Sequence, residues 1–326
     1  MFEPEELFVV ESPAWTVDLS GSAVTAIDYS IDGAFVAYSN KPGIITIATS
    51  YTGEIKRVLE QKYTTNPITK IRFHPFEENL LICTSKDGFI FLYNIVKGEM
   101  VEMSRHLGSN LLAMNVDSFG ETFAIACADG SIRVYDLENL QRTKVLVKMA
   151  SRTSASQQVN IYDICFHPED SNVILAAGWN DRVLYWDVRT GNAERNIAGP
   201  HIRGAGLDVH NDTIITASAR DKKQIEMWDY GSGKKLREIN INPETAKKEC
   251  YINACKVSRN GLALAAGGSG CNLTQSFEFS HGTYIGQTAP YSSPVSYVAV
   301  SPFGSSFVTG TENGDISCHM IRLKPN

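Results

Sequence analysis

The stretch 161–191, IYDICFHPEDSNVILAAGWNDRVLYWDVRTG, divides into three apolar runs that are separated by turn residues. The first run carries Ile161, Ile164 and Phe166 and ends at a His-Pro pair, the second spans 173–177, and the third spans 183–186. Short β-branched and aromatic runs between Pro, Gly, Asn and Asp are typical of antiparallel strands, since about five residues are too few for a helix. One such set cannot bury its own faces, so we expect copies of it elsewhere in the chain.

The apolar spacing of the first run, at positions i, i+3 and i+5, recurs along the whole chain. The triplets begin at Val24, Ile68, Leu111, Ile161 and, in weaker form, at Gly204, Ile252 and Val295. Subtracting successive first positions gives spacings of 44, 43, 50, 43, 48 and 43 residues. That period, with four strands to a unit, predicts the blades of a β-propeller.

A Trp-Asp dipeptide closes the third run of several units. It stands as Trp186-Asp187 and Trp228-Asp229, varies to Tyr135-Asp136 and Tyr93-Asn94, and decays to Phe277-Glu278, His319-Met320 and Ile47-Ala48. With these motifs the chain resembles the WD-repeat (G-beta-like) family over essentially its entire length, although the family's Gly-His pair is nearly absent. The resemblance implies an all-β fold, a seven-bladed β-propeller of four-stranded antiparallel blades. We expect residues 1–326 to form one such domain, of a subfamily that the motifs do not identify.

The last unit supplies only three strands, at about 294–300, 305–310 and 315–321. A ring that ends in a three-stranded blade would expose an unpaired edge, which closed folds avoid. The strand-like run Leu7–Glu11 precedes the first complete unit. We therefore predict that it pairs as the outermost strand of the last blade, and the resemblance implies the same closure.

Composition narrows the class of protein. The chain has 326 residues, is 43% hydrophobic, and contains no apolar run near the ~20 residues of a membrane span. Its acidic N-terminus lacks the order of a secretory signal, so we expect a cytoplasmic or nuclear protein. Seven cysteines without a CxxC pair argue against a disulfide framework or a zinc site. Those within predicted strands are expected to be buried: Cys83, Cys127, Cys165, Cys255 and Cys318.

The sequence also predicts the conformation of several turns and the location of the long links between blades. Asp87-Gly88, Asp129-Gly130 and Asn313-Gly314 predict two-residue hairpins with type I′ turns. The glycine-rich 267–270 is expected in a turn between strands. The long links 148–158 and 242–249 are expected to be surface loops, where binding residues concentrate.

A search for chemistry finds little. No nucleophile elbow, P-loop, HExxH or dinucleotide fingerprint occurs. His74 and His167 belong to repeated Phe-His-Pro turns and are expected to be structural. His201 with Ser218, Asp221 and Trp228 resembles the hydrogen-bonded tetrad of a WD blade, which we prefer over a catalytic Ser/His/Asp set. We therefore expect no enzyme, no catalytic residue, no cofactor and no metal.

The resemblance also assigns loops to faces. The loops before each first strand, and those between the second and third strands, lie on the face called the top. This places on the top face Arg105, His106, Arg152, His201, Arg203, Arg220, Lys222, Lys223, Lys247 and Lys248. The sector over blades four to six is thus predicted to be basic on a chain of formal charge −6, which favours an acidic partner segment. The alternative is solvated charge in loops.

Three binding hypotheses follow. The first is a platform that docks partner proteins or peptides on the top face and rim, where Trp179 is expected to be exposed. In the second, 174–189 resembles the box that attaches some WD-repeat proteins to cullin-type ubiquitin ligases, so that Asp187 and Arg189 contact the adaptor. The third is a methyl-lysine reader with Trp179, Tyr251 and Tyr291 as its aromatic cage.

The expected partners are proteins or peptides, with the chain monomeric alone and part of a larger complex. A membrane is not expected. Nucleic acid is less favoured, because no aromatic-basic stripe suited to single strands is visible.

Overall fold

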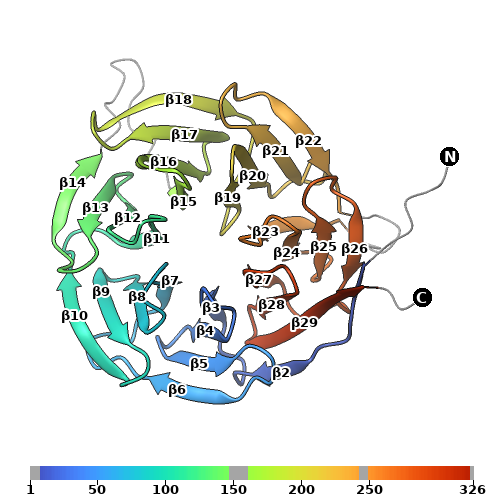
Figure 1. Cartoon of the computed structure of the whole chain (residues 1–326), viewed down its shortest axis with the longest axis horizontal. Helices are drawn as coiled ribbons and strands as arrows, with labels where there is room; N and C mark the ends of the chain where they lie inside the picture. Colours follow the sequence, from blue (N-terminus) through green and yellow to red (C-terminus); the bar gives the residue numbers. More distant parts are fainter. Residues whose placement is uncertain (1–7, 147–160, 242–248, 324–326) are drawn as a thin grey trace.

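The computed structural model describes residues 8–146, 161–241 and 249–323. Within these ranges the chain forms seven antiparallel sheets arranged as blades around a central axis (Figure 1). The predicted all-β, seven-bladed propeller is confirmed. No helix among the described residues has the length and apolar character needed to cross a membrane.

Each blade begins at the axis with the strand that carries the apolar triplet (Figure 1). These innermost strands are β3 (Val24–Tyr29), β7 (Ile68–Phe73), β11 (Leu111–Val116), β15 (Ile161–His167), β19 (Leu207–His210), β23 (Tyr251–Val257) and β27 (Val295–Val300). The second strands are β4 (Phe35–Asn40), β8 (Leu80–Ser85), β12 (Thr122–Cys127), β16 (Asp170–Gly178), β20 (Thr213–Ala217), β24 (Ala263–Ser269) and β28 (Ser306–Thr311).

The outer half of each blade contains the Trp-Asp position and the solvent-facing edge. The third strands are β5 (Ile45–Thr49), β9 (Phe89–Asn94), β13 (Ile132–Asp136), β17 (Arg182–Asp187), β21 (Ile225–Asp229), β25 (Thr274–Glu278) and β29 (Asp315–Leu323). The outermost strands of blades one to six are β6 (Ile55–Leu59), β10 (Glu99–Arg105), β14 (Arg142–Leu146), β18 (Asn192–Ala198), β22 (Lys235–Ile239) and β26 (Tyr284–Gln287).

Apolar clusters between neighbouring blades form the core. Blades three and four, for example, enclose Ala126, Ile132, Ile164 and Trp186, all essentially inaccessible to solvent. The same kind of cluster occurs between blades seven and one, where Tyr38 packs with residues from β28 and β29. Each blade therefore depends on both neighbours for the burial of its faces.

The N-terminal segment closes the last blade, as predicted, but in two pieces. β1 (Phe8–Val10) pairs with 321–323, and β2 (Trp15–Asp18) pairs with 315–318 of the same strand, β29. The prediction that 7–11 covers the edge of 316–321 is therefore only partly correct, because β2 covers most of that edge. Leu7 lies outside the described residues.

Trp15 has a role that the repeat pattern did not predict. In blade one the strand register places Ala48, and not Ile47, at the position that blades two to five fill with tryptophan or tyrosine. Trp15 packs into the cluster that contains Ala48, and its indole N–H donates a hydrogen bond to the Ser50 carbonyl at 2.7 Å. The N-terminal strand thus supplies to blade one the aromatic side chain that its own sequence lacks.

Two predictions about turns need correction. The Asp-Gly and Asn-Gly hairpins are not type I′, because the glycine alone has positive φ, as at Gly88 (101°). The Gly88 N–H donates to the Ser85 carbonyl, so glycine ends a longer turn that requires only one left-handed residue. Residues 267–269 belong to β24 and not to a turn. A Cβ at Gly267 would lie 2.6 Å from a methyl group of Val295, so the position needs glycine for close packing.

The cysteines divide into two groups. The five that were predicted within strands are buried and free, as expected. Cys250 and Cys271, whose Cα atoms are 5.0 Å apart, form a disulfide at the start of blade six. The cysteine count did not predict this bond, because spatial proximity across a blade leaves no signature in spacing.

Candidate functional site

Trp179 is an exposed aromatic residue on the top face, in the turn between β16 and β17. Its side chain is 53% exposed, as the sequence predicted. The His201 ring lies edge-on at 4.5 Å and Tyr162 lies at 6.4 Å, both between ring centroids. The Arg203 guanidinium lies 5.5 Å from the indole centroid. These four residues, the Trp179 cluster, join blade four to the loop that leads into blade five. Tyr162 was not predicted.

The predicted tetrad around His201 is wrong in its partners. The His201 Nδ1 donates to the Asp181 carboxylate at 2.6 Å, whereas only its backbone N–H reaches the Ser218 hydroxyl. The Trp228 indole donates to the Thr216 hydroxyl at 2.9 Å instead. The loop before blade five lies over the turn between β16 and β17 of blade four, and this places His201 beside Asp181. The hydrogen bond to Asp181 holds His201 against Trp179.

Two of the four described arginines and lysines of the predicted basic sector are neutralised by acids that lie on strands. Arg220 pairs with Glu226 at 2.8 Å, and Lys223 pairs with Glu238 at 3.3 Å. Glu226 is only 3% exposed and also holds Lys235, so Arg220 stabilises a buried carboxylate. Glu226 and Glu238 lie on strands, whereas Arg220 and Lys223 lie on a loop, so their pairing depends on the tertiary structure and could not be predicted from the loop sequences alone.

The other predicted top-face residues are dispersed. The Arg105 guanidinium covers the Phe89 ring at 4.4 Å, and the His106 N–H donates to the Gly88 carbonyl at 2.7 Å. Burial lowers the pKa of His106, and nearby Arg133 acts in the same direction. Arg152, Lys247 and Lys248 lie outside the described residues.

The three proposed cage aromatics do not form a cage. The Tyr251 hydroxyl donates to Glu249 at 3.1 Å, and Tyr291 packs between blades six and seven with its hydroxyl against Ser317. Among the described residues neither ring contacts Trp179. The three come from different blades, and the ring geometry keeps them apart.

The possible adaptor-contact residues lie on the face opposite Trp179, in the turn between β17 and β18. The Asp187 carboxylate accepts hydrogen bonds from the backbone of Arg189 and Thr190, and its ion pair with the Arg189 guanidinium is 2.7 Å long. These bonds, of which the Arg189 side chain's is the strongest, lower the pKa of Asp187 to about 2. Asp187 therefore stabilises its own turn, while the Arg189 side chain is exposed.

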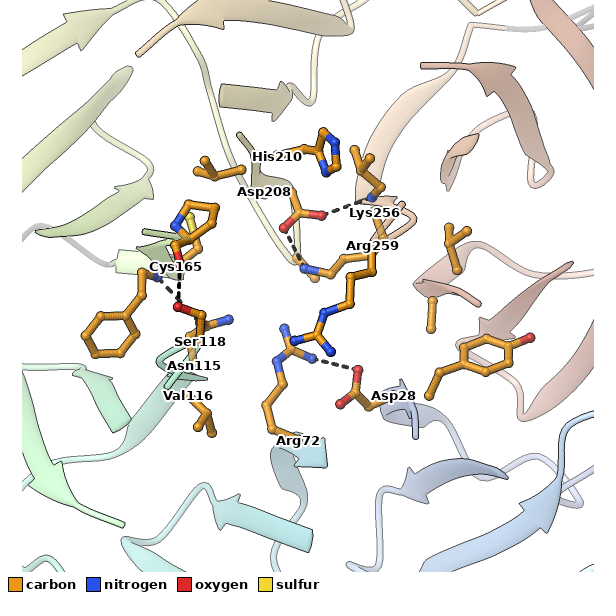
Figure 2. Close-up of a pocket in the computed structure, with 18 of the residues that line it drawn as sticks. Asp28, Arg72, Asn115, Val116, Ser118, Cys165, Asp208, His210, Lys256 and Arg259 are labelled. Atoms are coloured by element: carbon orange, nitrogen blue, oxygen red, sulfur yellow. Dashed lines mark hydrogen bonds and ion pairs between the residues drawn. The ribbon is translucent and has the colours of Figure 1, made fainter. Parts of the chain in front are cut away.

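Sequence reasoning missed a cavity of about 360 Å³ at the axis, at the face of the turns between first and second strands. Figure 2 shows Arg72 and Arg259 pointing into it, with Asp28 and Asp208 at its sides. The lining includes the residue between the second and third members of each apolar triplet: Asp28, Arg72, Asn115, Cys165, Asp208, Lys256 and Ala299. That repeated position is a signal in the sequence that could have revealed the cavity.

The carboxylates of the cavity all have partners. Asp28 accepts from the Phe73 N–H at 3.0 Å and pairs with Arg72 at 3.4 Å, and Asp208 pairs with Lys256 at 2.7 Å (Figure 2). Burial raises the pKa of Asp28, although the Arg72 charge opposes the shift. The Asp117 carboxylate faces the turn that follows it, where it accepts a hydrogen bond from the Glu121 N–H.

A buried ion pair crosses the axis at the inner end of the cavity. The Lys70 ammonium lies 2.9 Å from the Asp163 carboxylate, and both side chains are at most 5% exposed. Asp163 also accepts the Leu207 N–H at 3.1 Å, and Tyr297 lies under the ammonium with its centroid at 5.2 Å. Burial disfavours the charge of Lys70, but Asp163 and Tyr297 together oppose this effect and raise the pKa of Lys70. These contacts join blades two, four, five and seven, and all four residues line the cavity.

The comparisons with known proteins agree with the fold. No family model matches the chain. It is 24% identical over 251 residues to WD repeat-containing protein YPL247C of Saccharomyces cerevisiae, which covers 56% of this chain and 45% of the relative. It is 22% identical to the nuclear distribution protein PAC1 of Komagataella phaffii over 52% of this chain and 35% of the relative. A DDB1- and CUL4-associated factor 7 homolog of Dictyostelium discoideum is 23% identical, over 60% of this chain and 63% of the relative.

These relatives and the seven blades confirm the resemblance: the chain is similar to WD-repeat proteins and folds as a seven-bladed β-propeller, and no subfamily is identified. The matched region spans less than half the length of PAC1 and of YPL247C.

Proposed function

We propose that this protein is a non-enzymatic interaction platform whose principal partner docks on the Trp179 cluster of the top face. The observation that carries the proposal is the half-exposed indole, for which the fold has no packing need. Trp, Tyr and Arg dominate the binding energy of protein interfaces. The cluster offers all three within one contact network.

The side chains of the Trp179 cluster are also preorganised for binding. The hydrogen bond to Asp181 fixes His201, and His201 in turn limits the motion of the indole. A side chain that is already held loses less conformational entropy when a partner covers it. Arg203 occupies the cation position over the indole, which disfavours a methylated lysine as the ligand.

We propose further that the partner presents an acidic segment near the cluster. Arg203 and Lys222 are exposed, and among the described residues neither forms an ion pair. They can steer an oppositely charged partner, whereas Arg220 and Lys223 are already paired. The proposed location in the cell remains the cytosol or nucleus, with residues 1–326 as one domain.

Affinity capture from the native cell, followed by quantitative mass spectrometry, tests the proposal. The bait is compared with Trp179→Ala and with Tyr51→Ala, which removes an aromatic side chain of similar exposure on blade one. We expect Trp179→Ala to reduce recovery of the principal partner about tenfold or more, as truncation of a hot spot does. Recovery with Tyr51→Ala should match the parent. Equal recovery with all three baits would contradict the proposal.

A second candidate function is that of a substrate receptor for a cullin-type ubiquitin ligase. The relative whose name contains DDB1 and CUL4, together with the exposed Arg189 in the box of blade four, favours it. Because Asp187 is committed to its turn, Arg189 is the side chain available to an adaptor. Binding of purified adaptor that Arg189→Ala abolishes, and that Trp179→Ala leaves intact, would support this function. No binding to the adaptor would exclude it.

A further inference from the structure

We propose that the axial cavity and the turns around it form a second docking site, which binds a carboxylate side chain within an apolar segment of a partner protein. This site lies on the face opposite the Trp179 cluster and does not depend on it. The cavity lies at the turns between first and second strands, whereas Trp179 lies in a turn between second and third strands, so that both sites can be occupied at once.

The charge of the ligand follows from Arg259, the one arginine or lysine lining the cavity that has no hydrogen-bond or ion-pair partner among the described residues. Arg72 and Lys256 are each paired with an aspartate. Arg259 is exposed, points into the cavity in Figure 2, and forms no hydrogen bond or ion pair with any described residue. A planar guanidinium matches a carboxylate in a bidentate geometry.

The number of charges distinguishes a carboxylate from a polyanion. One uncommitted cation neutralises one negative charge. Asp28 and Asp208 line the same cavity and would repel a ligand with several charges, such as a polyphosphate. The arrangement therefore fits the single charge of a glutamate or aspartate side chain.

The surroundings of the mouth show that the ligand is a protein segment. Three turns carry a phenylalanine directly after a residue that lines the cavity: Phe76 after Pro75, Phe119 after Ser118, and Phe303 after Pro302. Their side chains are 66%, 50% and 60% exposed, respectively. Leu262, in the turn that also carries Arg259, is 61% exposed. A small molecule inside the cavity would not reach these tips, but a chain that crosses the mouth would cover them.

The polarity of the rim indicates where such a segment lies. The apolar tips belong to blades two, three, six and seven, and turns on the same face also expose acids: Glu77, Glu78, Glu121, Glu169 and Asp212. A segment with a central acid and apolar flanks would lie over the apolar tips and place its acid beside Arg259, away from these acids. Exposed aromatic side chains around an arginine are also the composition of an interface hot spot.

An array of nine-residue peptides tests the site directly. Each peptide carries a central Glu with Leu, Phe or Ile at the two positions on each side, and matched peptides carry central Gln or phosphoserine. Affinities are measured by fluorescence polarisation for the parent, Arg259→Gln, Arg259→Lys and Phe303→Ser. Arg259 and Phe303 are exposed, so these variants should melt like the parent. Arg182→Gln, an exposed arginine on the top face, is the matched control.

We expect Glu peptides to bind the parent at least tenfold more tightly than Gln peptides. Arg259→Gln should remove this preference, Arg259→Lys should restore part of it, and Phe303→Ser should weaken binding severalfold. Arg182→Gln and Trp179→Ala should bind like the parent. Hydrogen exchange of the complex should show protection at 74–77, 117–121 and 301–304.

Several results would overturn the inference. One is an array without any Glu peptide that binds better than its Gln counterpart. Another is binding that survives Arg259→Gln, or that is lost in Trp179→Ala. Arg259-dependent binding of phosphoserine peptides or of inorganic phosphate, without binding of Glu peptides, would show that the cavity selects a different anion. Loss of the proposed top-face partner would leave all of these measurements unchanged.

Discussion

Blade four and blade seven are built to the same plan from different parts of the chain. Blade four takes its four strands from one continuous stretch, β15 to β18, and buries Trp186 at 1% exposure. Blade seven takes three strands from the C-terminal part and completes its edge with β1 and β2. In the register position of Trp186 it has His319.

The difference shows how a repeat fold tolerates the loss of its motif. Blade four follows the local pattern, whereas blade seven depends on contacts that close a loop of some 300 residues, such as the His319 Nδ1 that donates to the Glu11 carbonyl at 3.0 Å. Such closure is entropically expensive, but the cost grows only slowly with loop length. Blade seven is therefore the part of the ring where the stability of the whole depends on the chain ends.

The largest loss of stability is expected for the substitution of two buried tryptophans, which can be compared directly. Trp186→Ala should lower the free energy of unfolding by about 3–5 kcal/mol, through lost burial and the cavity left behind. Trp15→Ala should be similarly costly, although Trp15 lies outside the repeats, because it fills the space beside Ala48. Urea denaturation of both variants measures this. A cost below about 1 kcal/mol for Trp15→Ala would show that closure does not depend on this side chain.

The next effect concerns the edge of blade seven. Deletion of residues 1–12 removes β1 but leaves β2, so the pairing of 321–323 and the backbone contacts of Glu11 with Met320 and His319 are lost. We expect a loss of about 1–3 kcal/mol and a tendency to aggregate through the exposed edge. Thermal melting and light scattering measure both, with deletion of residues 1–7 as control. If the two deletions behave alike, β1 contributes nothing to closure.

A smaller effect should appear in the pH dependence of stability. Burial lowers the pKa of His319, although its bond to the Glu11 carbonyl opposes the shift. A histidine whose folded pKa is lowered stabilises the protein above its unfolded pKa, near 6.5, and this stability is lost as the pH falls through the folded value. Melting temperature between pH 7 and 5 should therefore fall less steeply in His319→Phe than in the parent. His106 and His210 keep their own contributions in both proteins. Equal slopes would exclude His319 as a source.

The smallest change in stability is expected at Trp179, where blade four is exposed to solvent. Trp179→Ala should change stability by no more than about 0.5 kcal/mol, because the indole is exposed and its neighbours remain solvated. Thermal melting beside Trp186→Ala gives the direct contrast. If Trp179→Ala unfolds the protein as readily, the Trp179 cluster is part of the core and not a binding surface.

The amino-acid sequence by itself determined the strands, the number of blades and the need for closure. Each of these depends on local spacing: alternation along a strand, turn residues at its ends, and a repeat near 43 residues that one unit cannot bury alone. The exposure of Trp179 and the burial of the five strand cysteines could be predicted for the same reason.

Only the tertiary structure decided which distant residues became partners. Lys70 and Asp163 are 93 positions apart and meet because two blades face the same axis. Trp15 occupies the space beside Ala48, and Glu226 neutralises Arg220 from a strand rather than from a loop. The cavity with Arg259 likewise exists only where seven strands converge. Charges and side-chain volumes are complementary between residues that are neighbours in space. The spacing of residues along the chain does not predict how closely two side chains approach each other in the closed ring.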